Sequence, residues 1–304
     1  MNSPKINPYF VLVIGVLTVS ASAILVKLCT AESGAIAFYR LFFTIIIMLP
    51  VFVMKNVKEI KLITKKDWIF SIISGVCLAF HFILWFESLN YTSVTSSTVL
   101  VTLQPLFAFA GTFLFFKEKF TLKAILCGIV AIAGSVVISW GDFKISGMAL
   151  FGDLLAFIAC MLVTAYFLFG QDVRKRLSLM TYTFIVYVIS AFVLLLYVLI
   201  VGESLVPTNN KDWIYFLLLA ILPTLLGHTL FNWTVKWLST SIISMAILFE
   251  PIGASILAFF ILKENILLSQ ILGGTIILIS ISLFIIDEKK NKTNIVEQEV
   301  FNAQ

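Results

Sequence analysis

Two stretches of this chain match one another along their whole length: TVLVTLQPLFAFAGTFLFFKEKFTLKAILCG at 98–128 and SMAILFEPIGASILAFFILKENILLSQILGG at 244–274. A constant offset over about 30 residues indicates an internal duplication. The chain is therefore expected to consist of two copies of one structural unit. The aligned pairs all stand 146 residues apart: Gln104 and Glu250, Pro105 and Pro251, Lys117 and Lys263, Glu118 and Glu264, Gly128 and Gly274.

The composition places both copies in a membrane. Soluble domains carry about 25% charged residues, whereas 12% of this chain is charged, 61% is hydrophobic and the mean hydropathy is +1.07. A soluble fold of this length cannot hide so much apolar surface, so the solvent must be lipid. The apolar runs are continuous and do not alternate with polar residues, which favours helices over barrel strands. The predicted fold class is an all-α membrane protein.

Ten runs are long enough to cross a bilayer, which takes about 20 apolar residues per helix. The connections between them are short, so we expect no inserted soluble domain. The expected transmembrane helices are about 9–28, 34–54, 69–89, 94–116, 122–140, 149–169, 179–201, 213–235, 239–262 and 267–286.

Each copy then holds five transmembrane helices, and this odd number predicts an inverted repeat. After five crossings the second copy enters the membrane from the opposite side, as in many secondary transporters. The expected units are 1–140 for the first five-helix repeat, 141–286 for the second, inverted five-helix repeat, and 287–304 for a polar cytoplasmic tail.

The distribution of basic residues predicts the orientation. With the N-terminus inside, sixteen of the 21 Lys and Arg residues fall in cytoplasmic segments and four fall on the opposite side. Cytoplasmic loops carry such an excess, so both termini are expected on the cytoplasmic side of the cytoplasmic (inner or plasma) membrane. The same bias explains the net charge of +5, and no nucleic-acid binding is expected, because the basic patches lack a folded reading surface.

The start of the chain also has features of a secretory signal. Ala21-Ser22-Ala23 is similar to a signal-peptide cleavage site. The apolar run continues past it to Val26, and the repeat requires a first helix, so we expect this segment to be a transmembrane helix.

The motifs together resemble the EamA-type branch of the drug/metabolite transporter superfamily. The resemblance rests on the Gln104-Pro105 and Glu250-Pro251 pairs in helices four and nine, on GVLTVSASAILVK at 15–27 and on AFYRLFFT at 37–44. It covers about 5–286. It implies export or exchange of small metabolites, often amino acids or amphipathic compounds. One departure is that a proline common ahead of the family's second helix is absent from ESGAIAFYR, which leaves the entry of that helix undefined.

Two polar residues are expected near the bilayer midplane, each followed by a proline. Gln104 and Glu250 lie roughly 11 residues into their helices, at about 1.5 Å per residue. Polar groups at this depth can replace the water shell of a solute, and Pro105 and Pro251 interrupt the helices there. Glu250 is also the candidate for proton coupling, since Gln104 cannot titrate. The alternatives are a packing kink for the prolines and a structural ion pair for Glu250.

The remaining candidates for substrate binding lie on other helices. His81 and Trp85 share one helix face, as do His228 and Asn232, because each pair is four residues apart. The alternative for the histidines is hydrogen bonding between helices. Arg40 either binds a substrate carboxylate, pairs with an acid such as Glu87, or extends outward to the headgroups. Tyr166 and Trp233 complete the predicted site, and aromatic packing is the alternative for both.

Neither a metal nor a cofactor is expected. The four cysteines lack metal-ligand spacing, no carboxylate or cysteine cluster accompanies the two histidines, and no GxxxxGK motif is present. The expected partners are a small-molecule substrate, the lipid bilayer and protons, and the sequence leaves the choice between a monomer and a homodimer open.

Three classes of function remain after these observations. The first is a secondary active transporter that exports or exchanges a small organic metabolite by alternating access. A nucleotide-sugar or sugar-phosphate exchanger of related architecture is its nearest alternative, although such ligands need several basic groups in the cavity. An intramembrane enzyme and a non-transporting scaffold are more distant alternatives, since no HExxH or aspartate-rich metal motif is found.

Overall fold

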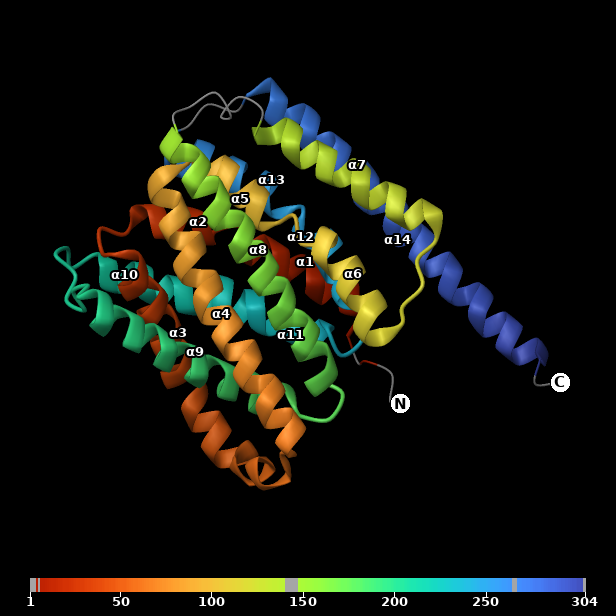
Figure 1. Ribbon diagram of the computed structural model, residues 1–304, viewed down its shortest axis with the longest axis horizontal. Helices are drawn as coiled ribbons and strands as arrows, with labels where there is room; N and C mark the ends of the chain where they lie inside the picture. Colours follow the sequence, from red (N-terminus) through yellow and green to blue (C-terminus); the bar gives the residue numbers. More distant parts are fainter. Residues whose placement is uncertain (1–3, 5, 140–146, 264–266, 303–304) are drawn as a thin grey trace.

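The computed structural model describes residues 4, 6–139, 147–263 and 267–302, and all regular elements in these ranges are helices. Figure 1 shows them gathered in one bundle. The first copy comprises α1 (Pro8–Val19), α2 (Ser22–Leu28), α3 (Ser33–Val51), η1 (Phe52–Asn56), η2 (Val57–Leu62), α4 (Lys65–Tyr91), α5 (Val94–Val101), α6 (Pro105–Phe116) and α7 (Leu122–Ser139). The second comprises α8 (Gly147–Val173), α9 (Leu179–Val201), α10 (Asp212–Leu219), η3 (Ala220–His228), α11 (Thr229–Thr234), α12 (Thr240–Ile247), α13 (Glu250–Ile261) and α14 (Leu268–Asn302).

Eight helical segments in the described ranges are long and apolar enough to cross a membrane, so the chain is a multi-pass membrane protein. Two shorter apolar helices, Leu122–Ile138 and Ile271–Asp287, occupy the last position of each copy, and ten crossings stay a prediction. The eight segments are Pro8–Leu28, Ser33–Leu62, Lys65–Tyr91, Val94–Phe116, Gly147–Val173, Leu179–Val201, Asp212–Thr234 and Thr240–Ile261.

The two prolines of the duplicated stretch interrupt their helices at the same place. Helix α5 ends at Val101 and α6 begins at Pro105, while α12 ends at Ile247 and α13 begins at Glu250. A proline has no N–H to donate and fixes its own φ, so it fits the first turn of a helix but not the interior. The predicted interruption at Pro105 and Pro251 is therefore present in both copies.

A second equivalence appears where each broken span ends. Lys117 and Lys263 both adopt a left-handed backbone, with φ of 56° and 60°, and no other non-glycine residue of the described chain does so. This conformation is rare for a side chain other than glycine, so its occurrence at two positions 146 residues apart supports the duplication. Glu264, which follows Lys263, lies outside the described residues.

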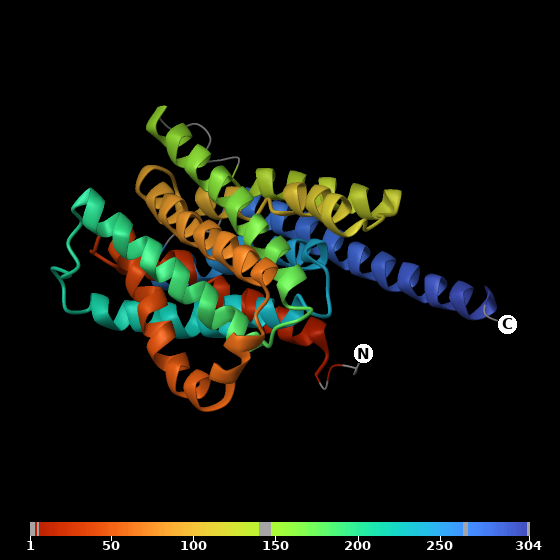
Figure 2. The same cartoon turned by 60° about the horizontal axis from the view of Figure 1, so that its bottom comes forward.

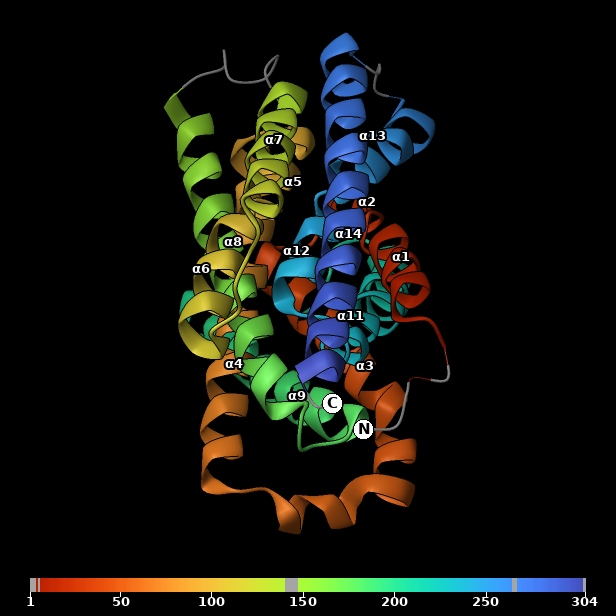
Figure 3. The same ribbon diagram turned by 90° about the vertical axis from the view of Figure 1, so that its right-hand side faces the viewer.

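The last helices of the two copies, α7 and α14, lie side by side and run in opposite directions (Figures 1 and 3). Their backbones are closest at two glycines, since a Cβ on Gly273 would come 2.4 Å from the carbonyl oxygen of Gly134. The other pairings also recur in both copies: α4 packs along α8, and the equivalent α1 packs along η3 and α11. Figure 3 places both termini at the same end of the bundle as η1 and η2.

Several elements differ from the sequence-based expectation of plain helices and a polar tail. The span expected at 9–28 is divided into α1 and α2, the span expected at 34–54 ends in the π-helix η1, and two further differences lie in the second copy. The span expected at 213–235 contains a π-helix, η3, in which Pro223 lies and the Thr224 hydroxyl donates to the carbonyl of Leu219 at 2.8 Å, five residues back. The polar tail continues α14 as helix to Asn302 and projects beyond the bundle (Figure 2). Lys, Glu and Gln in this tail are good helix formers, which accounts for the extension.

Candidate functional site

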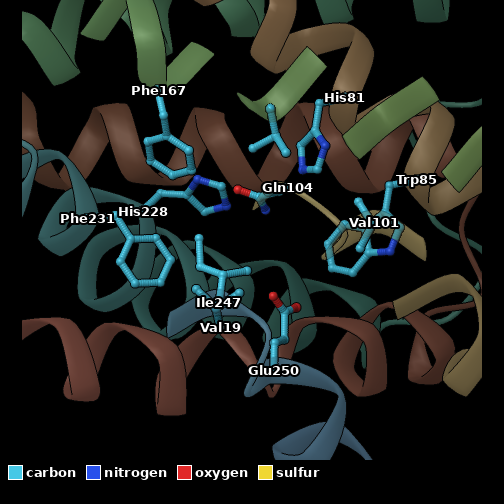
Figure 4. Close-up of a pocket in the computed structure, with 11 residues that line it drawn as sticks. Val19, His81, Trp85, Val101, Gln104, Phe167, His228, Phe231, Ile247 and Glu250 are labelled. Atoms are coloured by element: carbon cyan, nitrogen blue, oxygen red, sulfur yellow. The ribbon is translucent and has the colours of Figure 1, made fainter. Parts of the chain in front are cut away.

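One cavity collects side chains from both copies of the repeat (Figure 4). It is narrow, about 20 Å³, which is room for about one water molecule. Five of the predicted site residues line it, and they come from four separate helical spans. The lining residues are Val19, His81, Trp85, Val101, Gln104, Val163, Phe167, His228, Phe231, Ile247 and Glu250.

The two broken spans deliver the polar residues at the centre. Gln104 is the N-cap of α6 and Glu250 is the first residue of α13, and these side chains are 4% and 5% exposed. The N-terminal end of a helix carries a partial positive charge. The position of Glu250 thus explains how a carboxylate is tolerated in an apolar segment, and the same field favours an anionic group of a ligand.

Helix α4 contributes His81 and Trp85 from one face, as their spacing predicts. Their rings stack with centroids 5.8 Å apart. Nδ1 of His81 lies 3.0 Å from the carbonyl oxygen of Ala159. Only a protonated nitrogen can donate to a carbonyl, so Nδ1 holds the hydrogen and Nε2 remains available as an acceptor. The Trp85 indole N–H has no partner in the described part of the chain.

His228 reaches the cavity from the C-terminal end of η3. Its ring stacks on Phe167 with centroids 6.1 Å apart and lies 6.3 Å from the His81 ring. Nδ1 of His228 and Oε1 of Gln104 are buried without a hydrogen-bond partner among the described residues. Buried polar atoms normally find a partner, so three unpartnered atoms around one cavity, these two and the Trp85 N–H, indicate a site for a polar solute.

Arg40 lies outside this lining. It is fully buried, its Nε donates to the Thr224 hydroxyl at 2.7 Å, and its Nη1 donates to the Ser22 hydroxyl at 3.0 Å. The guanidinium also lies 4.3 Å from the centre of the Phe82 ring. It therefore neither extends to the headgroups nor pairs with Glu87, whose carboxylate accepts from Asn90 instead. These contacts join α3, α2 and η3, which places Arg40 behind the cavity wall.

Three further predicted residues also lie away from the cavity lining. Asn232 is fully buried and donates to the Tyr166 hydroxyl and, at 2.7 Å, to the carbonyl of His228. Tyr166 is likewise fully buried. Trp233 packs against Trp237, with ring centroids 6.2 Å apart. Asn232 and Tyr166 therefore fix the segment that carries His228, while Trp233 contributes to aromatic packing.

The apolar half of the lining was not predicted from the sequence. Nothing distinguishes these six residues from the lipid-facing ones in a chain this hydrophobic, so no sequence signal could have selected them. The site that results combines one carboxylate, one amide, two imidazoles and an indole N–H with an aromatic and aliphatic wall, and none of its described lining residues is Lys or Arg. The missed residues are Val19, Val101, Val163, Phe167, Phe231 and Ile247.

Helical membrane proteins with this construction form a recognisable class. Two internally repeated halves, each interrupted by a proline where it meets a polar cavity, are typical of proteins that move small solutes across membranes. The fold and the cavity thus define a multi-pass membrane transporter.

The comparison with known families identifies the branch. The model of the EamA-like transporter family matches residues 7–140 and 150–286, one match for each copy. The chain belongs to this family.

The similar proteins are named transporters as well. The chain is 23% identical over 234 residues to the uncharacterized transporter YxxF of Bacillus subtilis, covering 76% of this chain and 74% of that protein. It is 20% identical to an uncharacterized transporter of Archaeoglobus fulgidus (88% and 92% covered) and 25% identical to the riboflavin transporter ImpX of Fusobacterium nucleatum (78% and 83% covered). A crystal structure at 13% identity superposes with a TM-score of 0.74, covers 93% of this chain and 98% of that chain, and shows that the fold is shared.

Proposed function

We propose that this protein is a secondary active transporter that exports or exchanges a small organic metabolite across the cytoplasmic membrane by alternating access. The supporting observation is the convergence of Gln104 and Glu250, one from each broken span, on a cavity between the repeats. The narrowness of this cavity fits a state between two openings, because a metabolite enters only when the surrounding helices separate.

The charges of the cavity favour a zwitterion or a weakly charged amphiphile as the substrate. Glu250 would accept a substrate ammonium group, while the N-terminal ends of α6 and α13 would favour a carboxylate. The rings of Trp85, Phe167 and Phe231 provide an apolar wall for the rest of the molecule. An amino acid with an apolar or aromatic side chain meets these requirements.

A planar amphipathic compound is the second substrate to test. The relative in Fusobacterium nucleatum is named a riboflavin transporter, and stacked aromatic rings line the present cavity. Nucleotide sugars and sugar phosphates are disfavoured, since ligands with two or more negative charges need basic groups and none is among the described lining residues.

We further propose that Glu250 couples proton movement to transport. Its carboxyl group lines the cavity, is 5% exposed and lies within electrostatic reach of Arg40, so it can exchange its proton for a substrate group. Replacement by Gln keeps the shape of the side chain and removes the proton exchange.

The test is transport by the purified protein in vesicles with an imposed pH gradient. Riboflavin and a panel of radiolabelled amino acids are offered to the wild type, to Glu250→Gln and to the control Glu87→Gln. We expect gradient-driven accumulation to fall about tenfold or more in Glu250→Gln and to be unchanged in the control, since Glu87 does not line the cavity and its hydrogen bonds stay within α4. Full gradient-driven transport by Glu250→Gln would show that the coupling proposal is wrong, and a product formed without flux would favour an intramembrane enzyme.

A further inference from the structure

At each end of the bundle, two acids of one repeat bind the connection between the first two spans of the other repeat. We name these contacts the termini-side clamp, formed by Glu59 and Asp67, and the far-side clamp, formed by Glu203 and Asp212. The termini-side clamp lies at the end where Figure 3 shows both termini, and the predicted crossings place the far-side clamp on the opposite side of the membrane.

The termini-side clamp is built on charges. Asp67, at the start of α4, is 1% exposed and accepts from Arg176 through Nε at 2.7 Å and Nη2 at 2.6 Å. Glu59 in η2 accepts from the backbone N–H of Ser178 at 2.7 Å and from the hydroxyls of Ser178 and Thr181. Both acids belong to the first repeat and hold the connection from α8 to α9 in the second.

The far-side clamp repeats this arrangement without a cation. Asp212, at the start of α10, is fully buried and accepts from Thr30 through the backbone N–H at 3.1 and 3.2 Å and through the hydroxyl at 2.9 Å. Glu203 accepts from the backbone N–H of Ala35 in α3 at 2.9 Å. Here both acids belong to the second repeat and hold the connection from α2 to α3 in the first.

The two clamps are copies of one another. Lys66-Asp67-Trp68 recurs as Lys211-Asp212-Trp213, 145 residues later. Their partners Thr30 and Arg176 stand 146 residues apart, which is the offset of the duplicated stretch. The two ends of the molecule are thus closed by equivalent contacts, each of which joins the repeats.

The clamps act on the helices that line the cavity. Helix α4 carries Asp67 at its start and His81 and Trp85 further along, and the segment that starts with Asp212 carries His228. Alternating access requires that the repeats separate at one end while they stay joined at the other. We propose that Asp67 and Asp212 are the paired gating residues of the transport cycle, and that releasing either one opens the cavity on its own side. This proposal rests on the proposed transport function.

The chemistry of the clamps makes the two gates unequal. Arg176 also donates to Asp172 at 2.5 Å, and its hydrogen bonds to both carboxylates raise the pKa of its guanidinium, so the cation persists at all physiological pH values. Hydrogen bonds with an ionised donor or acceptor are about twice as strong as neutral ones, and both clamps contain such bonds. The far-side clamp has only the charge of the acids, because its donors in Thr30 and Ala35 are uncharged.

Thiol labelling of a cavity position tests the gates without any substrate. Cys29, Cys77, Cys127 and Cys160 are replaced by Ala, Val163 in the cavity wall is replaced by Cys, and the protein is placed in vesicles of known orientation. A membrane-impermeant maleimide is then added to one side at a time. Asp67→Asn and Asp212→Asn are compared with Glu87→Gln, an acid at the end of α4 whose carboxylate accepts hydrogen bonds from Asn90 and Tyr91 of its own helix.

We expect the Asp-to-Asn substitutions at 67 and 212 to speed thiol labelling from opposite sides of the membrane. Asp67→Asn should raise the labelling rate from the termini side about tenfold, and Asp212→Asn should raise the rate from the far side to a similar degree. Each substitution replaces the charged carboxylate that accepts the hydrogen bonds of its clamp by a neutral amide. Glu87→Gln should change neither rate. Arg176→Gln removes the cation that bonds Asp67, and Thr30→Val removes the hydroxyl that donates to Asp212 while its backbone N–H stays. The first should reproduce the termini-side shift and the second a smaller far-side shift, even where an Asn variant fails to fold.

The outcomes separate gating from transport. Unchanged rates, or shifts in the same direction for both members of the pair, would overturn the proposal and make the acids static helix caps. If Asp67→Asn speeds labelling from the termini side and Asp212→Asn speeds it from the far side, but no metabolite offered is transported, the transport function is wrong and the gating role of the two acids is supported. Flux without labelling shifts would overturn the gates alone.

Discussion

At the scale of single residues, burial separates two kinds of polar group in this protein. Glu250 lines the cavity, and Oε1 of Gln104 is buried there without a hydrogen-bond partner among the described residues. Arg40 instead bonds two hydroxyls through Nε and Nη1 and lies over an aromatic ring, and only its Nη2 is left without a partner. A group that already has partners stabilises the fold, while a group without partners is available to a ligand. We therefore assign the first pair to the transport site and Arg40 to the support of the helices around it.

This assignment predicts the effect of Arg40→Lys. Lysine keeps the charge but lacks the planar fork that reaches Thr224 and Ser22 together, so we expect the free energy of unfolding in detergent to fall by about 2 kcal/mol and the melting temperature to fall with it. The exposed Lys65→Arg is the control and should change the stability by less than about 0.5 kcal/mol. Unchanged stability with a raised KM for substrate would instead place Arg40 in the binding site, as the sequence analysis expected.

Much of the site could be predicted at this scale, and the reason is electrostatic. A carboxylate or imidazole in an apolar run is costly, so Glu250, His81 and His228 stand out in the sequence, and all three line the cavity. Asn232 and Tyr166 stand out for the same reason but bind one another behind the wall. The residue type shows that a buried polar group needs a hydrogen-bond partner or a ligand, while only the packing shows which of the two it has.

At the scale of elements, the contact between α7 and α14 depends on glycine at one position and not at its neighbour. A Cβ on Gly273 would lie 2.4 Å from the Gly134 carbonyl oxygen, whereas a Cβ on Gly274 would make ordinary contacts at 3.4 Å or more with Ile252. Small residues permit such close approach of membrane helices, which then associate through van der Waals contacts.

Gly273→Ala should therefore destabilise the protein, and Gly274→Ala should not. The added methyl group forces the two helices apart, and such overpacking costs about 1–3 kcal/mol. The melting temperature of each variant in the same detergent gives the comparison. An equal effect of both substitutions would mean that the two helices are not held at this contact. The duplicated sequence draws attention to Gly274, the partner of Gly128, and only the helix crossing identifies Gly273.

At the scale of the whole molecule, both termini, η1 and η2 lie at one end of the bundle (Figure 3). The excess of Lys and Arg lies on the same side, which predicts that this end faces the cytoplasm. A single cysteine introduced in the segment 203–211 of a cysteine-free variant should be labelled by an impermeant maleimide in right-side-out vesicles and not in inside-out vesicles. A single cysteine in the tail at 287–304 should show the reverse. Labelling of both positions from the same side would contradict the three crossings that are expected between them.

The sequence by itself determined the class of protein, the duplication and the two interrupted spans. Apolar content, a constant offset and the missing N–H of proline are local properties, and they act in the same way wherever the chain folds. The tertiary structure alone decided which polar groups meet. Arg40 bonds Thr224 and Asn232 bonds Tyr166. Asp67 and Asp212 each accept hydrogen bonds from the other repeat. Those contacts join residues that are tens to hundreds of positions apart, and in a bundle of near-equal apolar helices only the packing fixes which faces come together.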